Sequence, residues 1–203
     1  LDHHYLQGLR DLCQQNQWLL MFDEVQTGNG RCGSTYVCEQ LEIKPDVMLT
    51  AKGLGNGLPI GVCMARGEAA QLLGPGDHGS TYGGNPLCCA AAIAVLTTLR
   101  DDTVMQRARS VREVLLTALH EAITDSDLIA EVRGRGLMIG IQPRVATKEI
   151  VQRGLESGLL INVAGGDTIR VLPPLVMTDE QAGELGAGIA NIINDIAEQE
   201  NAL

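Results

Sequence analysis

The sequence has 203 residues, of which 45% are hydrophobic and only 2% aromatic, and its formal net charge is -10. This length allows one large domain or two small ones built around an aliphatic core. The negative charge argues against a nucleic-acid or anionic-membrane partner, because both select clustered Lys and Arg. No apolar run approaches the ~20 residues that cross a bilayer, so the sequence predicts a soluble protein.

The six cysteines form no Cys-x-x-Cys pair and have no paired histidine spacing, so we expect no metal site. Free thiols of this kind fit a reducing cytoplasm. The sequence begins at Leu1 directly within a helical pattern, and we expect it to belong to a longer protein. Four arginines lie on or beside one predicted helix, where we expect a solvated face: Arg100, Arg107, Arg109 and Arg112.

Strands and helices alternate in the first half of the chain, which is typical of an α/β fold. The apolar run at 18–22 predicts a buried strand. Proline is tolerated in a first helical turn, so Pro86 can open a helix. The predicted elements are helix 2–16, strand 18–22, a helical piece at 39–41, strands 46–50 and 61–65, a short helix at 67–73, and helices 86–99 and 103–123.

A smaller α+β unit follows residue 125. Thr178 is expected to cap its last helix, with acidic residues in the first turn where the helix dipole favours them. The predicted elements are two strands within 128–142, helix 147–157, strands 159–163 and 168–172, and a helix from 178 to about 197. We expect the boundary between the units within the long helix around 100–125, and we assign 1–115 and 116–203 to two domains.

Two polar side chains follow predicted strands directly. Asp23 ends the apolar run at 18–22, and its carboxylate could hold a cationic ligand group or cap the next loop. Lys52 ends the strand at 46–50 and precedes four glycines within ten residues, where the backbone can approach a ligand closely. Desolvation or a nearby cation frees a lysine lone pair for imine formation. On position alone, a surface lysine in a turn is the more common interpretation of Lys52.

Polar groups suited to binding anions occur at two further positions in the sequence. Ser80 and Thr81 precede Gly83-Gly84 and offer hydroxyls and amides to a phosphate, or form an ordinary turn. Arg170 lies inside an apolar strand, where a guanidinium needs an anionic partner. That partner is a substrate carboxylate or a structural Asp or Glu. Together with Asp23 and Lys52, these groups match what pyridoxal 5′-phosphate (PLP) chemistry on amino acids requires.

Five stretches in family order resemble the class III (ornithine-type) PLP-dependent aminotransferases, most closely the acetylornithine aminotransferases. They are LMFDEVQTGNGRCG, KPDVMLTAKGLGNGLPIG, HGSTYGGNPLCCAAA, VRGRGLMIGI and IRVLPPL. The resemblance implies an α/β fold, fold-type I, with this chain as the C-terminal half. It would comprise the later portion of the large PLP-binding domain and the small C-terminal domain.

The resemblance also implies residue roles. Lys52 would form the Lys-PLP aldimine and act as the catalytic acid and base, and Asp23 would pair with the pyridine nitrogen. Gln26 would contact the ring's phenolic oxygen. Thr81, with Ser80, would contact the phosphate of the cofactor bound to the partner subunit, across a homodimer interface. Arg170 would bind the substrate α-carboxylate.

The implied reaction moves an amino group from N2-acetyl-L-ornithine to 2-oxoglutarate, in arginine biosynthesis. Ornithine, succinylornithine, succinyl-diaminopimelate and 4-aminobutyrate aminotransferases share these blocks, and a non-catalytic oligomerisation module is a further alternative. Cys32 stands where the family usually has threonine, and Asn56 where glycine is common. The family's phosphate loop and ring-stacking aromatic would precede residue 1, so we expect this chain to be inactive alone.

Overall fold

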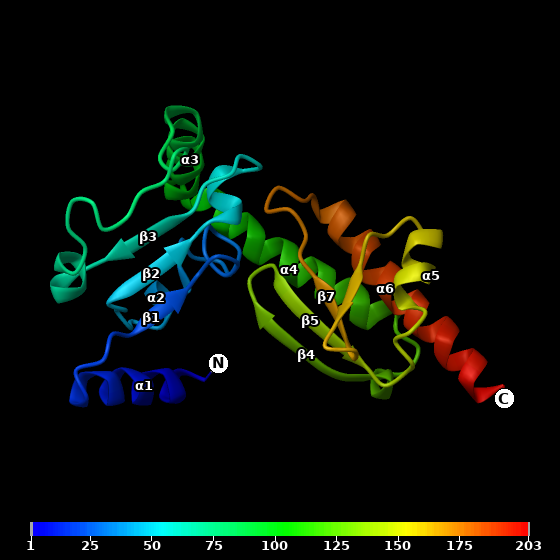
Figure 1. Ribbon diagram of the computed structural model, residues 1–203. Helices are drawn as coiled ribbons and strands as arrows, with labels where there is room; N and C mark the ends of the chain where they lie inside the picture. The colour runs from blue at the N-terminus through cyan, green and yellow to red at the C-terminus, as the bar shows by residue number, and fades with distance from the viewer. Residues whose placement is uncertain (1, 203) are drawn as a thin grey trace. The chain divides into compact units, whose positions relative to one another are not determined.

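The computed structural model describes residues 2–202, which divide into two units, Leu1–Thr103 and Val104–Leu203 (Figure 1). The division falls within the stretch 100–125 in which we expect the boundary, at a position before residue 115. The reason is the helix α4 (Asp102–Ala122), whose buried residues Ala108, Val111, Leu115 and Leu119 belong to the core of the second unit. Among the described residues, no helix is long and apolar enough to cross a membrane.

The first unit is built on a three-stranded sheet in the order β1-β2-β3, whose strands lie side by side in Figure 1. Strands β1 and β2 are parallel, and β3 is antiparallel to β2. The predicted α/β character is therefore confirmed. The elements are α1 (His3–Gln15), β1 (Met21–Asp23), α2 (Val37–Gln40), β2 (Val47–Thr50), η1 (Lys52–Gly55), β3 (Val62–Ala65), η2 (Gly67–Gln71) and α3 (Pro86–Arg100).

Helix α3 begins where the sequence predicts. The side chain of Asn85 caps it by accepting a hydrogen bond from the amide of Cys88 at 3.0 Å, and Pro86 occupies the first turn. Proline has no amide hydrogen to leave unpaired there, and its fixed φ suits a helix. Cys88 is buried, as expected for a small apolar side chain.

The prediction of a buried strand over 18–22 is wrong for most of the run. The strand begins only at Met21, and Trp18 and Met21 are 59% and 60% exposed. Leu20 alone in this run is fully buried, in a small core with Leu6 of α1. An apolar run is buried only where another element covers it, and the described residues cover one side of this run.

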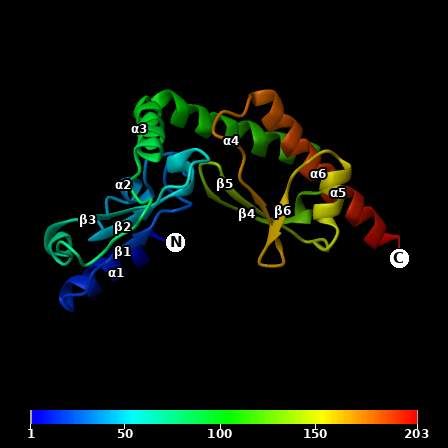
Figure 2. The same ribbon diagram turned by 45° about the horizontal axis from the view of Figure 1, so that its top comes forward.

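The second unit contains a four-stranded antiparallel sheet in the order β4-β5-β7-β6. Its large apolar core joins one face of this sheet to the helices α4 and α6, which run along each other in Figure 2. The elements after α4 are η3 (Ser126–Leu128), β4 (Ile129–Arg135), β5 (Met138–Pro143), α5 (Ile150–Glu156), β6 (Asn162–Ala164), β7 (Thr168–Val171) and α6 (Asp179–Asn201).

The predicted cap of the last helix is confirmed. The hydroxyl of Thr178 accepts from the amide of Gln181 at 3.2 Å, and the Gln181 side chain accepts from the amide of Thr178 at 3.0 Å. This reciprocal pair satisfies two of the donors that a helix start leaves free. The strand expected at 159–163 lies at Asn162–Ala164 instead, and Leu160 is 91% exposed.

The expectation of a solvated arginine face is met by Arg100 and Arg109, which are exposed, but not by Arg107 and Arg112. Arg107 Nη1 lies 3.0 Å from Asp179 Oδ1, and Arg112 Nη1 donates to the carbonyl of Gly136 at 3.0 Å. Both side chains are half-buried. Their partners are distant in sequence, so helical periodicity alone could not identify these contacts.

Helices α4 and α6 approach each other closely at Gly186. A Cβ added at Gly186 would lie 2.2 Å from the carbonyl oxygen of Leu115, which is backbone and cannot rotate away. At Gly183, one turn earlier on α6, an added Cβ would meet nothing within 4 Å. Of these two glycines, only Gly186 is therefore required by packing.

We expect Gly186→Ala to lower the free energy of unfolding by about 1–3 kcal/mol or more, because overpacking must move a helix backbone. Gly183→Ala is the matched control, and it should be neutral or stabilising by up to about 1 kcal/mol through helix propensity. Urea unfolding followed by circular dichroism measures both. Equal effects of the two substitutions would contradict the close approach of α4 and α6.

Candidate functional site

Asp23 and Lys52 lie at the same edge of the first unit's sheet. Asp23 is the last residue of β1 and pairs in register with Leu49 of the parallel strand β2. Lys52 comes three residues after Leu49, directly beyond the end of β2. The carboxyl ends of parallel strands are where open α/β sheets place their ligand sites. The structure thus brings a carboxylate and an amine to one sheet edge.

Both side chains are exposed and available to a ligand. Asp23 Oδ1 accepts a hydrogen bond from the amide of Val25 at 3.0 Å. Within residues 2–202, its second carboxylate oxygen accepts no hydrogen bond. Asp23 therefore keeps one oxygen for a cationic or N–H donor outside the described residues.

The backbone of Lys52 has φ +43°, in the left-handed region that long side chains rarely adopt. Such a conformation costs on the order of 1–3 kcal/mol and persists only where the surroundings impose it. It turns the chain sharply out of β2 into η1.

A buried asparagine holds the backbone immediately before Lys52. Asn29 Nδ2 donates to the hydroxyl of Thr50 at 2.9 Å and to the carbonyl of Ala51 at 3.1 Å. Asn29 and Thr50 are only 5% and 2% exposed. Tyr36 also forms a hydrogen bond with Thr50, and burial raises the pKa of its phenol. These buried bonds fix the end of β2.

Sequence reasoning missed Asn29, because its place between Gly28 and Gly30 is typical of an ordinary turn. Its φ of +56° and the amide facing β2 are visible only in the folded chain. One signal in the sequence pointed to Asn29: it is a polar residue in the glycine-rich loop that follows Asp23.

Glu24 organises the loop that carries Gln26. It is only 2% exposed, and its carboxylate accepts from the amides of Val37 and Cys38 at 3.0 and 2.9 Å. It also accepts from the Thr27 hydroxyl at 2.8 Å. Gln26 lies half-buried in this loop, which begins at the edge that carries Asp23.

Ser80 and Thr81 lie in the exposed loop before α3. The Ser80 hydroxyl accepts from the amide of Gly83 at 3.0 Å, so it closes a local turn. Helix α3, which this loop enters, packs against η1, the element that begins with Lys52. The exposed Thr81 remains suited to a phosphate, but its role there stays a prediction.

Arg170 belongs to the second unit, in β7. Its flanking residues Ile169 and Val171 are buried, so Arg170 lies on the opposite face of the sheet. With the Asn162 amide turned so that its oxygen faces the guanidinium, the orientation that satisfies both groups, it accepts from Arg170 Nη2 at 3.0 Å and donates to the Arg170 carbonyl at 3.2 Å. A guanidinium on a strand face is well suited to a carboxylate.

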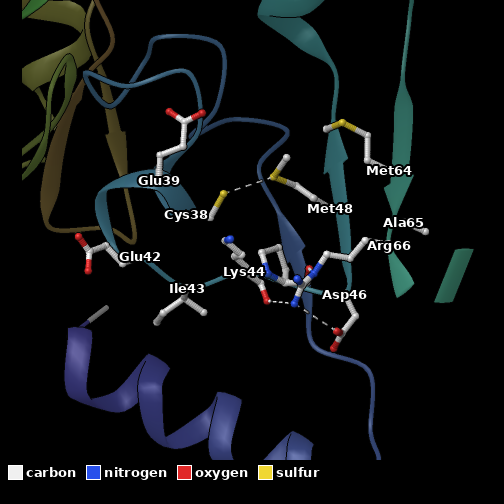
Figure 3. A pocket seen from close by; sticks show the side chains of 11 residues that line it. Cys38, Glu39, Glu42, Ile43, Lys44, Asp46, Met48, Met64, Ala65 and Arg66 are labelled. Atoms are coloured by element: carbon white, nitrogen blue, oxygen red, sulfur yellow. Dashed lines mark hydrogen bonds and ion pairs between the residues drawn. The ribbon is translucent and has the colours of Figure 1, made fainter. Parts of the chain in front are cut away.

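A hollow of about 480 Å³ lies elsewhere in the first unit (Figure 3). It contains none of the predicted site residues. Arg66 crosses its side, donating to the carbonyls of Pro45 and Lys44 at 2.7 and 3.0 Å. Burial raises the pKa of the Cys38 thiol in its wall, which keeps that thiol protonated and poorly nucleophilic. We therefore assign no chemistry to this hollow.

A model of the family described as aminotransferase class-III matches residues 1–193. The chain belongs to the class III aminotransferases. It is 41% identical over 199 residues to acetylornithine aminotransferase 1 of Bordetella pertussis, covering 98% of this chain and 51% of that protein. The chain thus spans about half the length of the curated relatives it matches.

Solved structures of similar proteins have the same fold. An ornithine aminotransferase of Toxoplasma gondii, with PLP at partial occupancy in its active site, matches with a TM-score of 0.88 and 34% identity. The match covers 97% of this chain and 48% of that one. An acetylornithine aminotransferase of Elizabethkingia anophelis matches with a TM-score of 0.84 and 32% identity, over 96% and 50% of the two chains. The predicted family and fold are therefore confirmed.

One departure of this class III chain from the family pattern has a physical explanation. Asn56, where glycine is common, has φ +46° and ψ +44°, which is left-handed. Asparagine is the non-glycine residue best tolerated there. The substitution therefore keeps the turn after η1 that follows Lys52.

We expect Asn29→Ala to lower the free energy of unfolding by about 1–3 kcal/mol, because it removes a buried hydrogen bond of Thr50 and leaves the partly buried carbonyl of Ala51 without this donor. Asn16→Ala is the matched control, since Asn16 also donates to a carbonyl, that of Leu12 at 2.8 Å, but is exposed. It should change stability by about 0.5 kcal/mol or less. Chemical unfolding measures both variants. If Asn29→Ala lowers the free energy of unfolding no more than Asn16→Ala does, Asn29 does not hold the end of β2.

Proposed function

We propose that the protein carrying this chain is a PLP-dependent aminotransferase. It moves the amino group of N2-acetyl-L-ornithine to 2-oxoglutarate, giving N-acetyl-L-glutamate 5-semialdehyde and L-glutamate, a step of arginine biosynthesis. The observation that carries this proposal is the placement of Asp23 and Lys52 at one edge of the parallel pair β1–β2 in a class III chain. Relatives about 40% identical, named acetylornithine aminotransferases, support the choice of amino donor.

The residues of this edge fit PLP chemically. Lys52 offers an exposed amine for the aldehyde, on a backbone held in the left-handed region. Asp23 offers a carboxylate oxygen for a protonated ring nitrogen. The hydroxyls of Ser80 and Thr81 are exposed and suit a phosphate, and Gln26 can reach the ring's phenolic oxygen from the loop after β1.

Each residue then has one task in the reaction. PLP, when bound, supplies the electron sink for a carbanion at the substrate carbon. Asp23 keeps the ring nitrogen protonated. Lys52 Nζ would hold the cofactor through its amine and, once free, would move a proton at the substrate carbon as general base and acid. Arg170 binds a substrate carboxylate through its guanidinium.

The chain spans about half the length of its relatives, so we propose that residues outside it complete the site. Residues 1–115 would form the later portion of a large PLP-binding domain, and residues 116–203 the small domain. We further propose a cytoplasmic homodimer in which Thr81 serves the partner subunit. The exposed apolar residues Tyr82, Leu87 and Ile93, on α3 and the loop before it, favour a covered surface there.

A second class of function is a non-catalytic module that keeps only the fold. Asp23, Lys52 and Arg170 argue against this alternative, because a module without chemistry has no need for a strained lysine at the sheet edge. Ornithine as the donor is the nearest catalytic alternative, and similar solved structures of ornithine aminotransferases support it.

The chain has three lysines, at 44, 52 and 148, and we expect borohydride reduction with PLP to label Lys52 alone. The protein should be expressed at the full length its gene encodes and mapped by peptide mass spectrometry. Lys52→Ala should remove the label, and the control Lys44→Ala should retain it. Labelling that survives Lys52→Ala, or no labelling at all, would overturn the assignment.

We expect the same full-length protein to transfer nitrogen from N2-acetyl-L-ornithine to 2-oxoglutarate with a kcat/KM at least about tenfold above that for ornithine. A tenfold preference corresponds to about 1.4 kcal/mol of transition-state binding, which one well-placed polar contact supplies. Glutamate formation in a coupled assay measures both donors. A higher kcat/KM for ornithine would reassign the donor and leave the reaction class intact.

A further inference from the structure

One row of residues crosses the whole sheet of the second unit. Arg133 of β4 pairs with Gly140 of β5, Gly140 with Arg170 of β7, and Arg170 with Asn162 of β6. Paired residues on neighbouring strands project from the same face. This face is opposite the core, because the residues on either side of Gly140, at 139 and 141, are buried. Two guanidiniums therefore flank a position without a side chain.

The first of the two arginines has three partners within the sheet. Arg133 Nη1 lies 2.7 Å from Glu131 Oε2 and donates to Gln142 Oε1 at 3.0 Å, while Nη2 donates to the Thr168 hydroxyl at 2.7 Å. Its charge is balanced by a carboxylate, and both ends of its fork are occupied. Arg133 thus stabilises the sheet and has little left for a ligand.

The second arginine has a different environment. Within residues 2–202, no carboxylate lies within ion-pair distance of Arg170. Its partner is the neutral amide of Asn162. Turned so that its oxygen faces the guanidinium, this amide accepts from Nη2 at 3.0 Å and donates to the Arg170 carbonyl at 3.2 Å. A guanidinium has five N–H donors, so one bond to Asn162 leaves a two-pronged fork free. The described residues therefore leave the positive charge of Arg170 without an ion pair.

We propose that Asn162 is a positioning residue that sets Arg170 for the carboxylate of the substrate, an inference that rests on the function proposed above. Its amide holds the guanidinium at the sheet surface, so less side-chain freedom is lost when a carboxylate binds. Because the amide is neutral, it orients Arg170 without cancelling its charge. An aspartate at the same position would form the ion pair that Glu131 forms with Arg133, and would compete with the substrate.

The test uses the full-length protein and a probe that cannot react, the five-carbon dicarboxylate glutarate, titrated calorimetrically. Asn162→Leu should weaken glutarate binding about threefold to tenfold, the cost of immobilising one long side chain. Asn162→Asp should weaken it further, by about tenfold or more, because a like charge now faces the ligand. The PLP content, measured by absorbance, should stay unchanged in both variants.

Gln142→Leu is the matched control, since it removes the equivalent amide bond from Arg133 instead of Arg170. It should leave glutarate binding unchanged. Unaltered binding in both Asn162 variants, together with loss of binding in Arg170→Ala, would overturn the role of Asn162 and leave the proposed function standing. Unaltered binding in Arg170→Ala would instead overturn the carboxylate role of Arg170. If Gln142→Leu weakens glutarate binding as much as Asn162→Leu does, both substitutions act through the general stability of the sheet, and the positioning role of Asn162 is overturned.

Discussion

The parallel pairing of β1 with β2 is the constraint on which the candidate site depends. It places the end of β1 opposite Leu49, and thereby brings Asp23 and Lys52 to one edge of the sheet. The pairing alone would leave the chain after β2 free to continue in an extended conformation. The bonds of Asn29 to Thr50 and Ala51 end the strand, and the left-handed backbone of Lys52 begins η1.

Buried hydrogen-bonding groups, and not apolar packing, hold the sheet edge that carries Asp23 and Lys52. Glu24 caps the start of α2 and holds the loop of Gln26, while Asn29 holds the end of β2. Hydrogen bonds made in a desolvated environment are directional, and breaking one partner leaves the other unsatisfied. A site that must orient a cofactor ring gains more from such directional contacts than from a well-filled apolar core.

Sequence predicts those features that depend on local chemistry, and tertiary context accounts for the rest. Asn85-Pro86 and Thr178 mark helix starts because they act within a few residues, and Asp23 and Lys52 directly follow apolar strands. Family motifs added roles for Ser80, Thr81 and Arg170 that the residues alone left open. The exposure of Trp18 depends on which element covers it, and the ion pair of Arg107 with Asp179 joins residues far apart in the sequence. Arg133 and Arg170 look alike as arginines in strands, but Arg133 pairs with Glu131 two residues away in β4, whereas no carboxylate among residues 2–202 pairs with Arg170.

A crystal structure of the full-length protein grown with PLP would test the central claim most directly. The account predicts continuous density from Lys52 Nζ to the cofactor, with an Asp23 carboxylate oxygen within about 3 Å of the ring nitrogen. Cofactor bound away from the carboxyl edge of β1 and β2, or a ring nitrogen facing a group other than Asp23, would contradict it.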